Sequence, residues 1–271
     1  MNAARLPAAD PAGFLGSATP QDPLLRLRAV HTHIGAYHIL QGVDFAVRRG
    51  EVFVLLGRNG AGKTTTLRTI MGLWRASAGS IDFEGRTVSA LPTTAIARLG
   101  IAYVPENMGI FQHLSVRENM LLAARAARSL RDLDQARLER IFGWFPPLER
   151  FWLSPAGTLS GGQKQMLAIG RAIVEDRKLL IVDEPSKGLA PSIVENLFAA
   201  FLALRSEGLS ILMVEQNFAL ASRLGENVAV MDAGRIIHQG SMAGLATDEA
   251  LQHALLGLDL RQRGAGTPLP A

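Results

Sequence analysis

The chain has 271 residues, of which 48% are hydrophobic and 19% are charged, and its formal net charge is +4. A chain of this composition can bury a large core, which excludes general disorder. It contains no cysteine, which excludes disulfides and thiolate metal sites, and no apolar run of the roughly twenty residues that a membrane-spanning helix needs. The Lys and Arg residues are scattered, so the mild basic excess does not by itself indicate a nucleic-acid partner.

The two ends of the chain are predicted to be flexible tails. Residues 1–22 are rich in Ala and Pro and lack the apolar core of a signal peptide. A second tail is predicted at residues 262–271. Residues 23–261 between them are predicted to fold as one domain.

Strand-like and helix-like patterns alternate after the first tail. Alternating apolar and polar positions predict strands at Leu24–Val30 and Val43–Val47. The nearly continuous apolar run Glu51–Leu56 predicts a strand that is buried on both faces. A glycine-rich turn follows this run, and residues Lys63–Leu73 have the spacing of a helix. These segments form a strand–loop–helix unit.

The middle of the chain has a different pattern. Residues Ser115–Arg140 have helical periodicity with almost no β-branched residues, and Pro146, Pro147 and Pro155 break that pattern afterwards. Residues 107–158 are therefore predicted to be a mostly helical insertion. Beyond it, helices are predicted at Gly161–Glu175, Ile193–Ser206 and Phe218–Leu224, and strands at Leu179–Val182, Ser210–Val214 and Val228–Met231. This alternation predicts an α/β fold with a largely parallel sheet.

The glycine-rich turn matches the P-loop pattern G-x-x-x-x-G-K-[ST]. It comprises Gly57, Arg58, Asn59, Gly60, Ala61, Gly62, Lys63, Thr64 and Thr65. Its glycines let backbone N–H groups converge on phosphates, and the following helix points its positive end at the same anion. The Lys63 ammonium can lie against the β- and γ-phosphates of ATP, and the Thr64 hydroxyl can bind Mg²⁺. A chance match is the alternative, and the strand before and the helix after the turn disfavour it.

Two acids follow the apolar strand Leu179–Val182. A buried strand delivers Asp183 next to the P-loop, where its carboxylate can hold Mg²⁺ through water. Glu184 can reach the γ-phosphate side as a general base or as a group that orients water. The alternative is a pair of solvated acids at a strand end, which the P-loop upstream makes the weaker interpretation.

A third motif, Leu159-Ser160-Gly161-Gly162-Gln163, begins a predicted helix with Ser160 in an N-cap position. Within one chain this second anion site would duplicate the P-loop, whereas across two chains it could close the far side of the nucleotide. With the three motifs in this order, residues 24–258 resemble the ATP-binding-cassette (ABC) family. The resemblance implies a P-loop ATPase core with a mostly parallel sheet, an N-terminal antiparallel β subdomain and a helical subdomain insertion.

The resemblance also implies partners. Two cassettes would pair head to tail around two ATP molecules, and Gly60, Gly62, Lys63 and Thr64 of one would face Ser160 and Gly162 of the other. ATP would favour the closed dimer. The helical insertion is where such proteins dock a transmembrane partner. Four aromatic residues flank this region, and packing inside the insertion is favoured over partner contact for Trp144, Phe145, Phe151 and Trp152.

Several positions depart from the commonest pattern of the family. Glu106 stands where most members have the Q-loop glutamine, and its carboxylate can still approach Mg²⁺. Gln216 replaces the switch histidine, so its amide can donate to the γ-phosphate but cannot become cationic. The segment Pro185–Pro191 lacks the usual D-loop aspartate. The residue stacked on adenine is expected to be Ile34 or Tyr37.

Four segments, Gly57–Leu73, Val104–Met120, Asp183–Pro191 and Val214–Asn217, are similar to the second ATPase subunit of branched-chain amino-acid importers. That resemblance implies a second ATPase subunit, distinct or identical, and two transmembrane permeases fed by a periplasmic solute-binding protein. The chain would lie at the cytoplasmic face of the membrane and drive uptake of branched-chain amino acids or a related small polar solute. The alternatives are a soluble cassette protein acting on nucleic acid or the ribosome and an exporter ATPase, and no nucleic-acid partner is expected.

Overall fold

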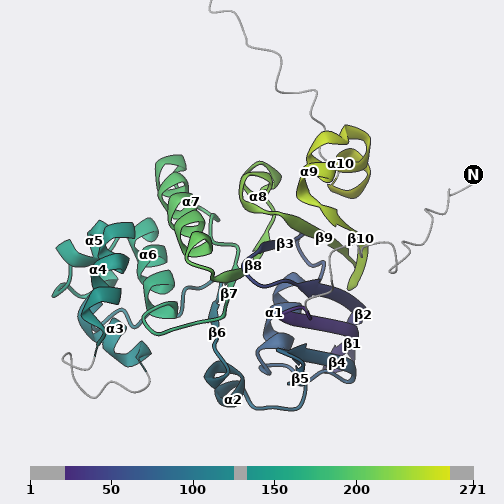
Figure 1. The fold of residues 1–271 in the computed structure, drawn as a ribbon, viewed down its shortest axis with the longest axis horizontal. Coiled ribbons are helices and arrows are strands. Elements are labelled where there is room, and N and C mark those ends of the chain that lie inside the picture. The colour runs from purple at the N-terminus through teal and green to yellow at the C-terminus, as the bar shows by residue number, and fades with distance from the viewer. Residues whose placement is uncertain (1–21, 125–132, 257–271) are drawn as a thin grey trace, which may run out of the picture.

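Two β-sheets organise the chain, which the computed structural model describes over residues 22–124 and 133–256 (Figure 1). The first is a four-stranded sheet of order β2-β1-β4-β5, and its strands pair antiparallel. The second has six strands in the order β10-β9-β3-β8-β7-β6. The first sheet consists of β1 (Leu25–Ile34), β2 (Tyr37–Val47), β4 (Ala78–Phe83) and β5 (Arg86–Thr87). The second consists of β3 (Val52–Gly57), β6 (Ile101–Val104), β7 (Leu179–Asp183), β8 (Ser210–Glu215), β9 (Asn227–Asp232) and β10 (Arg235–Ser241).

The second sheet is parallel except at one edge. Strands β6, β7, β8, β3 and β9 pair parallel to one another, and β10 pairs antiparallel with β9. Every residue of β3, β7 and β8 is buried, as expected for parallel strands covered on both faces. The predicted α/β fold, with its mostly parallel sheet and its antiparallel N-terminal sheet, is confirmed.

The helices surround this sheet. They are α1 (Lys63–Ile70), α2 (Thr93–Arg98), α3 (Val116–Ala123), α4 (Gln135–Trp144), α5 (Pro146–Arg150), α6 (Gly161–Ala172), α7 (Pro191–Ser206), α8 (Phe218–Leu224), α9 (Met242–Thr247) and α10 (Glu249–Leu256), with a 3-10 turn at Ala156–Thr158. In Figure 1, helices α3 to α6 gather at one end of the molecule and the antiparallel sheet lies at the other. The predicted insertion falls on α3, α4 and α5, and its residues 125–132 lie outside the described residues.

Each face of the parallel sheet has its own core, because successive side chains of a strand point to opposite faces. Val54 of β3 packs in the core shared with α3 to α8, whereas Leu55 packs in the core shared with the antiparallel sheet. Leu67 and Ile70 of α1 belong to the second core. Helix α1 is therefore fixed between the two sheets, and its N-terminal end lies at the carboxyl end of β3.

Some predicted elements differ from the structure. Helix α4 ends at Trp144, before the prolines, as predicted, but Pro146 and Pro147 then occupy the first turn of a new short helix, α5, where the N–H that proline lacks would have no partner within the helix. Strands β4, β5, β6 and β10 and helices α2, α9 and α10 are not among the predicted elements. The predicted tails, residues 1–22 and 262–271, lie outside the described residues apart from Asp22.

The aromatic residues near the insertion pack inside it, as was favoured. Phe145 is fully buried, and Phe142 contacts Trp152 edge to face with ring centroids 5.1 Å apart. Trp144 and Phe151 pack against the same core.

Candidate functional site

The P-loop joins β3 to α1 through backbone conformations that favour glycine. Gly57, Gly60 and Gly62 have φ angles of 153°, 80° and 108°. A Cβ atom at Gly57 would lie 2.3 Å from the Met231 carbonyl oxygen, so this position also needs glycine for space. Gly62 is the N-cap of α1 and provides no side-chain hydrogen bond to the helix. The first N–H groups of α1 are therefore available to an external acceptor, and the positive end of the helix dipole lies at the same place.

Lys63 is the first residue of α1, and its side chain is only 4% exposed. Its Nζ donates to the carbonyl oxygens of Gly57 at 2.7 Å and of Arg58 at 3.0 Å. It also lies 3.7 Å from Oε1 of Glu184. Burial lowers the pKa of Lys63, while the charges of Glu184 and Asp183 act in the opposite direction. The ammonium folds back over the P-loop, where its hydrogen bonds to carbonyls can be exchanged for bonds to phosphate oxygens.

Asp183 ends β7 beside α1. The Thr64 hydroxyl donates to its Oδ1 at 3.2 Å, and the Tyr103 hydroxyl donates to its Oδ2 at 3.4 Å. Burial raises the pKa of Asp183, and burial beside that carboxylate raises the pKa of Tyr103 to about 12. The hydroxyl of Thr64 and the carboxylate of Asp183 supply oxygen atoms of the kind that Mg²⁺ binds, so these residues fit that ion.

Tyr103 was not predicted as a site residue. It lies on β6, directly opposite Ile181 of β7 in the parallel pairing, two residues before Asp183. The sequence shows the tyrosine in an apolar run but gives no strand order, and only that order brings Tyr103 to Asp183.

Glu184 directly follows β7 and has a φ angle of 48°, which is uncommon outside glycine. Its N–H donates to the Val214 carbonyl at 3.0 Å, which fixes the backbone against β8. Burial favours the protonated carboxyl, but hydrogen bonds from Gln216 and Lys187 and the nearby lysine charges prevail and lower the pKa of Glu184. The side chain is 9% exposed and therefore is held as a carboxylate in a nearly enclosed place.

Gln216 connects the P-loop to Glu184. Its Nε2 donates to Oδ1 of Asn59 at 2.6 Å and to Oε1 of Glu184 at 2.5 Å. It directly follows Glu215, a 2% exposed residue at the end of β8 whose pKa is raised by burial. The carboxylate of Glu215 accepts from the N–H groups of Ser186 and Gln216, both at 3.2 Å. Glu215 was also not predicted, although an acid at the end of an apolar strand was its signal.

The structure brings together most of the residues predicted for the phosphate and metal sites. Glu106 differs, because its Oε1 pairs with Nζ of Lys187 at 2.6 Å and no described hydrogen bond joins it to Thr64 or Asp183. Strand β2 passes beside the P-loop, because Cδ2 of Leu40 would lie 3.2 Å from a Cβ atom built at Gly62. Ile34 is half-buried and Tyr37 is 75% exposed, and the two residues pair across the hairpin end.

The third motif forms the N-terminus of α6. Ser160 Oγ accepts from the N–H of Gln163 at 3.4 Å, and Gln163 Oε1 accepts from the N–H of Ser160 at 3.0 Å, which is a capping box. A Cβ at Gly162 would lie 2.5 Å from Cγ2 of Ile193, so α6 and α7 approach too closely for a larger residue. Ser160 and Gly161 are exposed, and no hydrogen bond or ion pair of the described residues joins this motif to the P-loop.

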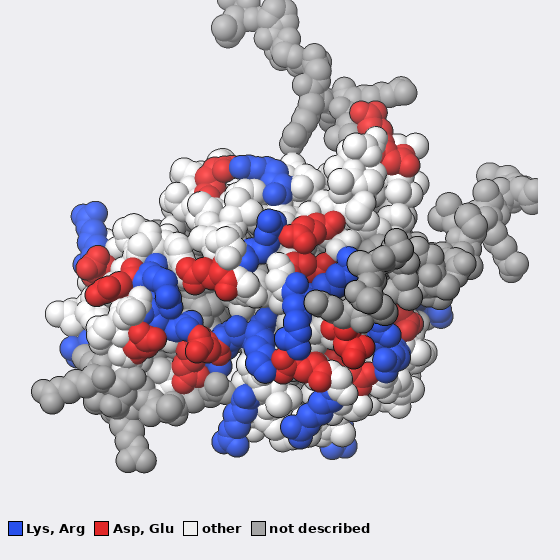
Figure 2. Space-filling view, in the orientation of Figure 1, with Lys and Arg blue, Asp and Glu red and all other residues white. Residues whose placement is uncertain are grey.

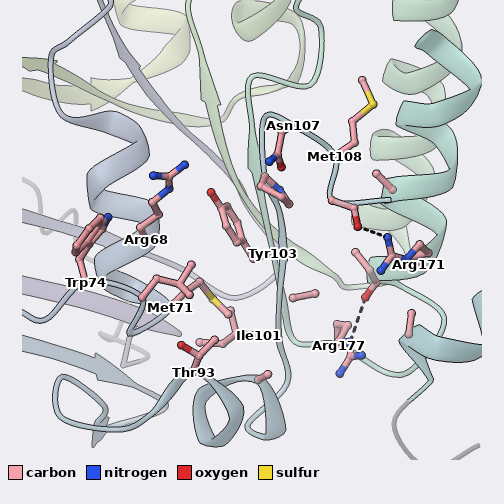
Figure 3. Close-up of a pocket in the computed structure, with 18 residues that line it drawn as sticks. Arg68, Met71, Trp74, Thr93, Ile101, Tyr103, Asn107, Met108, Arg171 and Arg177 are labelled. Carbon is pink, nitrogen blue, oxygen red and sulfur yellow. Dashed lines mark hydrogen bonds between the residues drawn. The ribbon is translucent and has the colours of Figure 1, made fainter. Parts of the chain in front are cut away.

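A cavity of about 670 Å³ lies between α1, α2, β6 and α6, and one of its lining residues is Tyr103, whose hydroxyl donates to Asp183. We call it the arginine-lined cavity, because Arg68, Arg171 and Arg177 border it (Figure 3). None of the described residues that line it is Asp or Glu. Arg171 donates to the Gly109 carbonyl at 2.6 Å, which fixes the loop after β6 as one wall.

The comparisons identify the family. The family model for ABC transporters matches residues 40–187. The BraG protein of Pseudomonas aeruginosa, a high-affinity branched-chain amino acid transport ATP-binding protein, is 40% identical over 86% of this chain and 100% of its own length. The chain belongs to the ABC transporter family. The LivF protein of Archaeoglobus fulgidus, a probable branched-chain amino acid transport ATP-binding protein, is 34% identical over 86% of this chain and 99% of its own length.

Solved structures have the same fold. An ATP-binding subunit of an ABC transporter is 31% identical and superposes with a TM-score of 0.73, covering 86% of this chain and 96% of its own. A nucleotide-free ATP-binding cassette superposes with a TM-score of 0.74 at 24% identity, covering 88% and 100%, and shows the fold alone. The predicted fold class and ATPase activity are confirmed by this membership. As part of an ABC transporter the chain works with membrane permease partners, and none of its described helices is long and apolar enough to cross a membrane.

Proposed function

We propose that this chain is the ATPase subunit of an importer for branched-chain amino acids or a related small polar solute. It works beside a second ATPase subunit, distinct or identical, beneath two permeases at the cytoplasmic face of the membrane, and a periplasmic binding protein delivers the solute. The names of the Pseudomonas and Archaeoglobus relatives support this solute class. The observation that carries the proposal is the meeting of Lys63, Thr64, Asp183 and Glu184 at the uncapped end of α1.

The roles of these residues follow from their positions. The P-loop N–H groups and Lys63 bind the β- and γ-phosphates of ATP, and Thr64 and Asp183 hold Mg²⁺. Bound Mg²⁺ would neutralise charge that develops on the phosphate oxygens. Glu184 accepts a proton from the attacking water at a carboxylate oxygen, and Gln216 orients that carboxylate through its amide. Because Asn59 bonds to the same amide, the P-loop and Glu184 are positioned together.

The N-terminus of α6 serves a second cassette. Ser160 and Gly161 are exposed and lie in a different part of the fold from the P-loop of the same chain, so an ATP molecule contacts them across a dimer. Ile34 or Tyr37 stacks on adenine, and the passage of β2 beside the P-loop at Leu40, three residues beyond Tyr37, supports this role.

The arginine-lined cavity receives a cytoplasmic segment of a permease. Leu73 and Trp74 at its rim are 51% and 37% exposed, which is large for apolar side chains. Its charged lining is basic, so the segment that fits carries apolar side chains and at least one carboxylate. On the face seen in Figure 2, Lys and Arg alternate with Asp and Glu instead of forming one basic surface, which disfavours a nucleic-acid partner.

The test is to purify the subunit from its native membranes in mild detergent and to identify the chains that accompany it. Two permeases with a second ATPase are the expected result. Uptake by the reconstituted complex, with branched-chain amino acids as the first solutes, then tests the solute class. A subunit recovered with nucleic acid and without a membrane protein would contradict the proposal.

A further inference from the structure

Lys187 joins two acids that come from different elements. Its Nζ lies 2.6 Å from Oε1 of Glu106 and 3.2 Å from Oε2 of Glu184. Glu106 follows β6 and is 45% exposed, whereas Glu184 follows β7 and is 9% exposed. Among the described residues, Lys187 is the one cation within ion-pair distance of both acids. We call this arrangement the Glu106–Lys187–Glu184 bridge.

One end of the bridge lies at the wall of the arginine-lined cavity. Residues 105–109 form a single loop, and the residues next to Glu106 on both sides, Pro105 and Asn107, line the cavity. The loop is anchored on the far side by the hydrogen bond from Arg171 to Gly109. Glu106 therefore belongs to the loop that an occupant of the cavity would contact.

The other end of the bridge lies at the proposed general base. The N–H of Lys187 donates to the carbonyl of Glu184 at 3.2 Å, so the two residues share one turn, and their side chains also meet. Without the ammonium, two carboxylates would face the same space and repel each other. The position of the Glu184 carboxylate thus depends on where Lys187 is held, and Glu106 is what holds it on the other side.

We propose that Lys187 is a positioning residue that couples the loop 105–109 to Glu184. This inference rests on the proposed function, because a permease segment in the cavity is what displaces the loop. Lys187 holds Oε2 of Glu184, whereas Gln216 and Lys63 hold Oε1. When the loop moves, Glu106 draws Lys187 with it, and the carboxylate of Glu184 is then held at Oε1 alone. The bridge thereby transmits occupancy of the cavity to the site of hydrolysis.

The first experiment measures hydrogen–deuterium exchange in the nucleotide-free full-length chain. Lys187→Met removes the ammonium and is expected to speed exchange in residues 105–109, whereas Glu106→Gln is expected to speed exchange in residues 185–189. A rise of about threefold in each distant segment is expected for ion pairs this exposed. If exchange rates change only in the segment that carries each substitution, the two loops are not coupled through Lys187 and the proposal is wrong. This experiment requires no permease.

A matched control is available on the antiparallel sheet. Arg28 pairs with Asp82 at 2.6 Å, and its side chain is 56% exposed. Lys187 pairs with Glu106 at the same distance, and its side chain is 55% exposed. Arg28→Met is expected to leave exchange in both loops unchanged. Lys187→Arg keeps the positive charge and is expected to retain the wild-type exchange rates in both loops.

The second experiment compares ATP hydrolysis by the subunit alone with hydrolysis in the permease complex. Lys187→Met is expected to reduce the stimulation by the permease about fivefold through kcat, with KM for ATP within about twofold of wild type. Glu106→Gln is expected to reduce stimulation by a similar factor, and the double variant to lose little more than either single variant.

The outcomes separate the two proposals. Lys187→Met could speed exchange in residues 105–109 and still leave the stimulation of ATP hydrolysis by the permease unchanged. The bridge would then be structural only, and its regulatory role would be overturned. A chain that binds no permease would refute the proposed function, and the exchange experiment would still decide whether Lys187 couples the two segments.

Discussion

Two helix N-termini in this chain carry anion-binding motifs, and the structure completes them in opposite ways. The N-cap of helix α1 is Gly62, which has a φ angle of 108° and provides no side-chain cap. Helix α6 begins at Ser160, whose side chain forms a capping box with Gln163. Buried charged groups, among them Lys63 and Asp183, surround the N-terminal end of α1. At the N-terminal end of α6, the neutral side chains of Ser160 and Gln163 form hydrogen bonds to each other's backbone N–H groups.

The difference indicates which end is completed by a ligand. An uncapped helix end leaves N–H groups without partners, and left-handed glycines restrict the chain further, so the end of α1 is costly until an anion binds. The end of α6 is stable without a ligand and is presented to the solvent. This contrast supports the proposal that the first end binds ATP within its own subunit and that the second meets an ATP molecule held by another subunit.

The largest expected effect comes from the acid beside the uncapped end. Glu184→Gln keeps the shape and the hydrogen bond to Gln216 but removes the base, so kcat for ATP hydrolysis should fall about a thousandfold while ATP still binds. The ATP-bound dimer should accumulate and be visible by size-exclusion chromatography. Hydrolysis at the wild-type rate would remove Glu184 from the role of base.

Lys63→Ala tests the uncapped end directly. The phosphates lose a buried cation, and ATP affinity measured by calorimetry should fall by about a hundredfold or more. The far-ultraviolet circular dichroism should stay unchanged, because the ammonium bonds only to carbonyls of the same loop and to Glu184. Unchanged affinity would refute the phosphate-binding role of the P-loop.

The contrast between the two ends was partly predictable from the sequence. The glycines, Lys63 and Ser160 occur at fixed spacings within short segments, and the helices predicted to follow both motifs are confirmed. The buried run of β3 and the acids after β7 were predicted for the same reason, since periodicity and burial are local signals.

What remained unpredicted depends on strand order and side-chain direction. Tyr103 reaches Asp183 because β6 lies beside β7, and no local pattern gives that order. The sequence places Glu106 near the predicted Mg²⁺ site, and its charge does act on Asp183, but no local pattern shows that its carboxylate also meets Lys187. Strand β4 was missed because its sequence, with two small residues at its start, has little alternation.

Ser160→Ala tests the capped end, and the chain offers a matched control for it. Ser160 caps α6 and Ser115 caps α3, each through a capping box. Either alanine variant should lose about 1 kcal/mol of the free energy of unfolding, measured with urea. Only Ser160→Ala should also weaken ATP-dependent dimerisation, because only α6 faces a second cassette in the proposed assembly. Equal dimerisation by both variants and the wild type would contradict a role of α6 across the dimer.

The smallest effect concerns the buried charge beside α1. Asp183→Asn has nearly the same shape and keeps an acceptor for Thr64, but it removes a carboxylate that burial disfavours. The nucleotide-free variant should melt a few degrees above the wild type, because a gain near 1 kcal/mol shifts Tm by roughly 2–4 °C in a domain of this size. Calorimetry of both proteins, with and without Mg²⁺ and ATP, provides the measurement, and the variant should lose the Mg²⁺-dependent part of the ligand's stabilisation.

The gain in stability of Asp183→Asn should depend on pH, and the pKa of Asp183 gives the direction of that dependence. Burial raises the pKa of Asp183 above its ordinary value of 3.8, so the folded chain holds the proton more tightly than the unfolded chain. Ionisation therefore weakens the native state as the pH rises from 3.8 through the folded pKa. The advantage of Asp183→Asn should be smallest at the acid end, grow across this window and then level off. A gain that does not change with pH would show that burial of the charged Asp183 carboxylate does not lower the stability of the wild type.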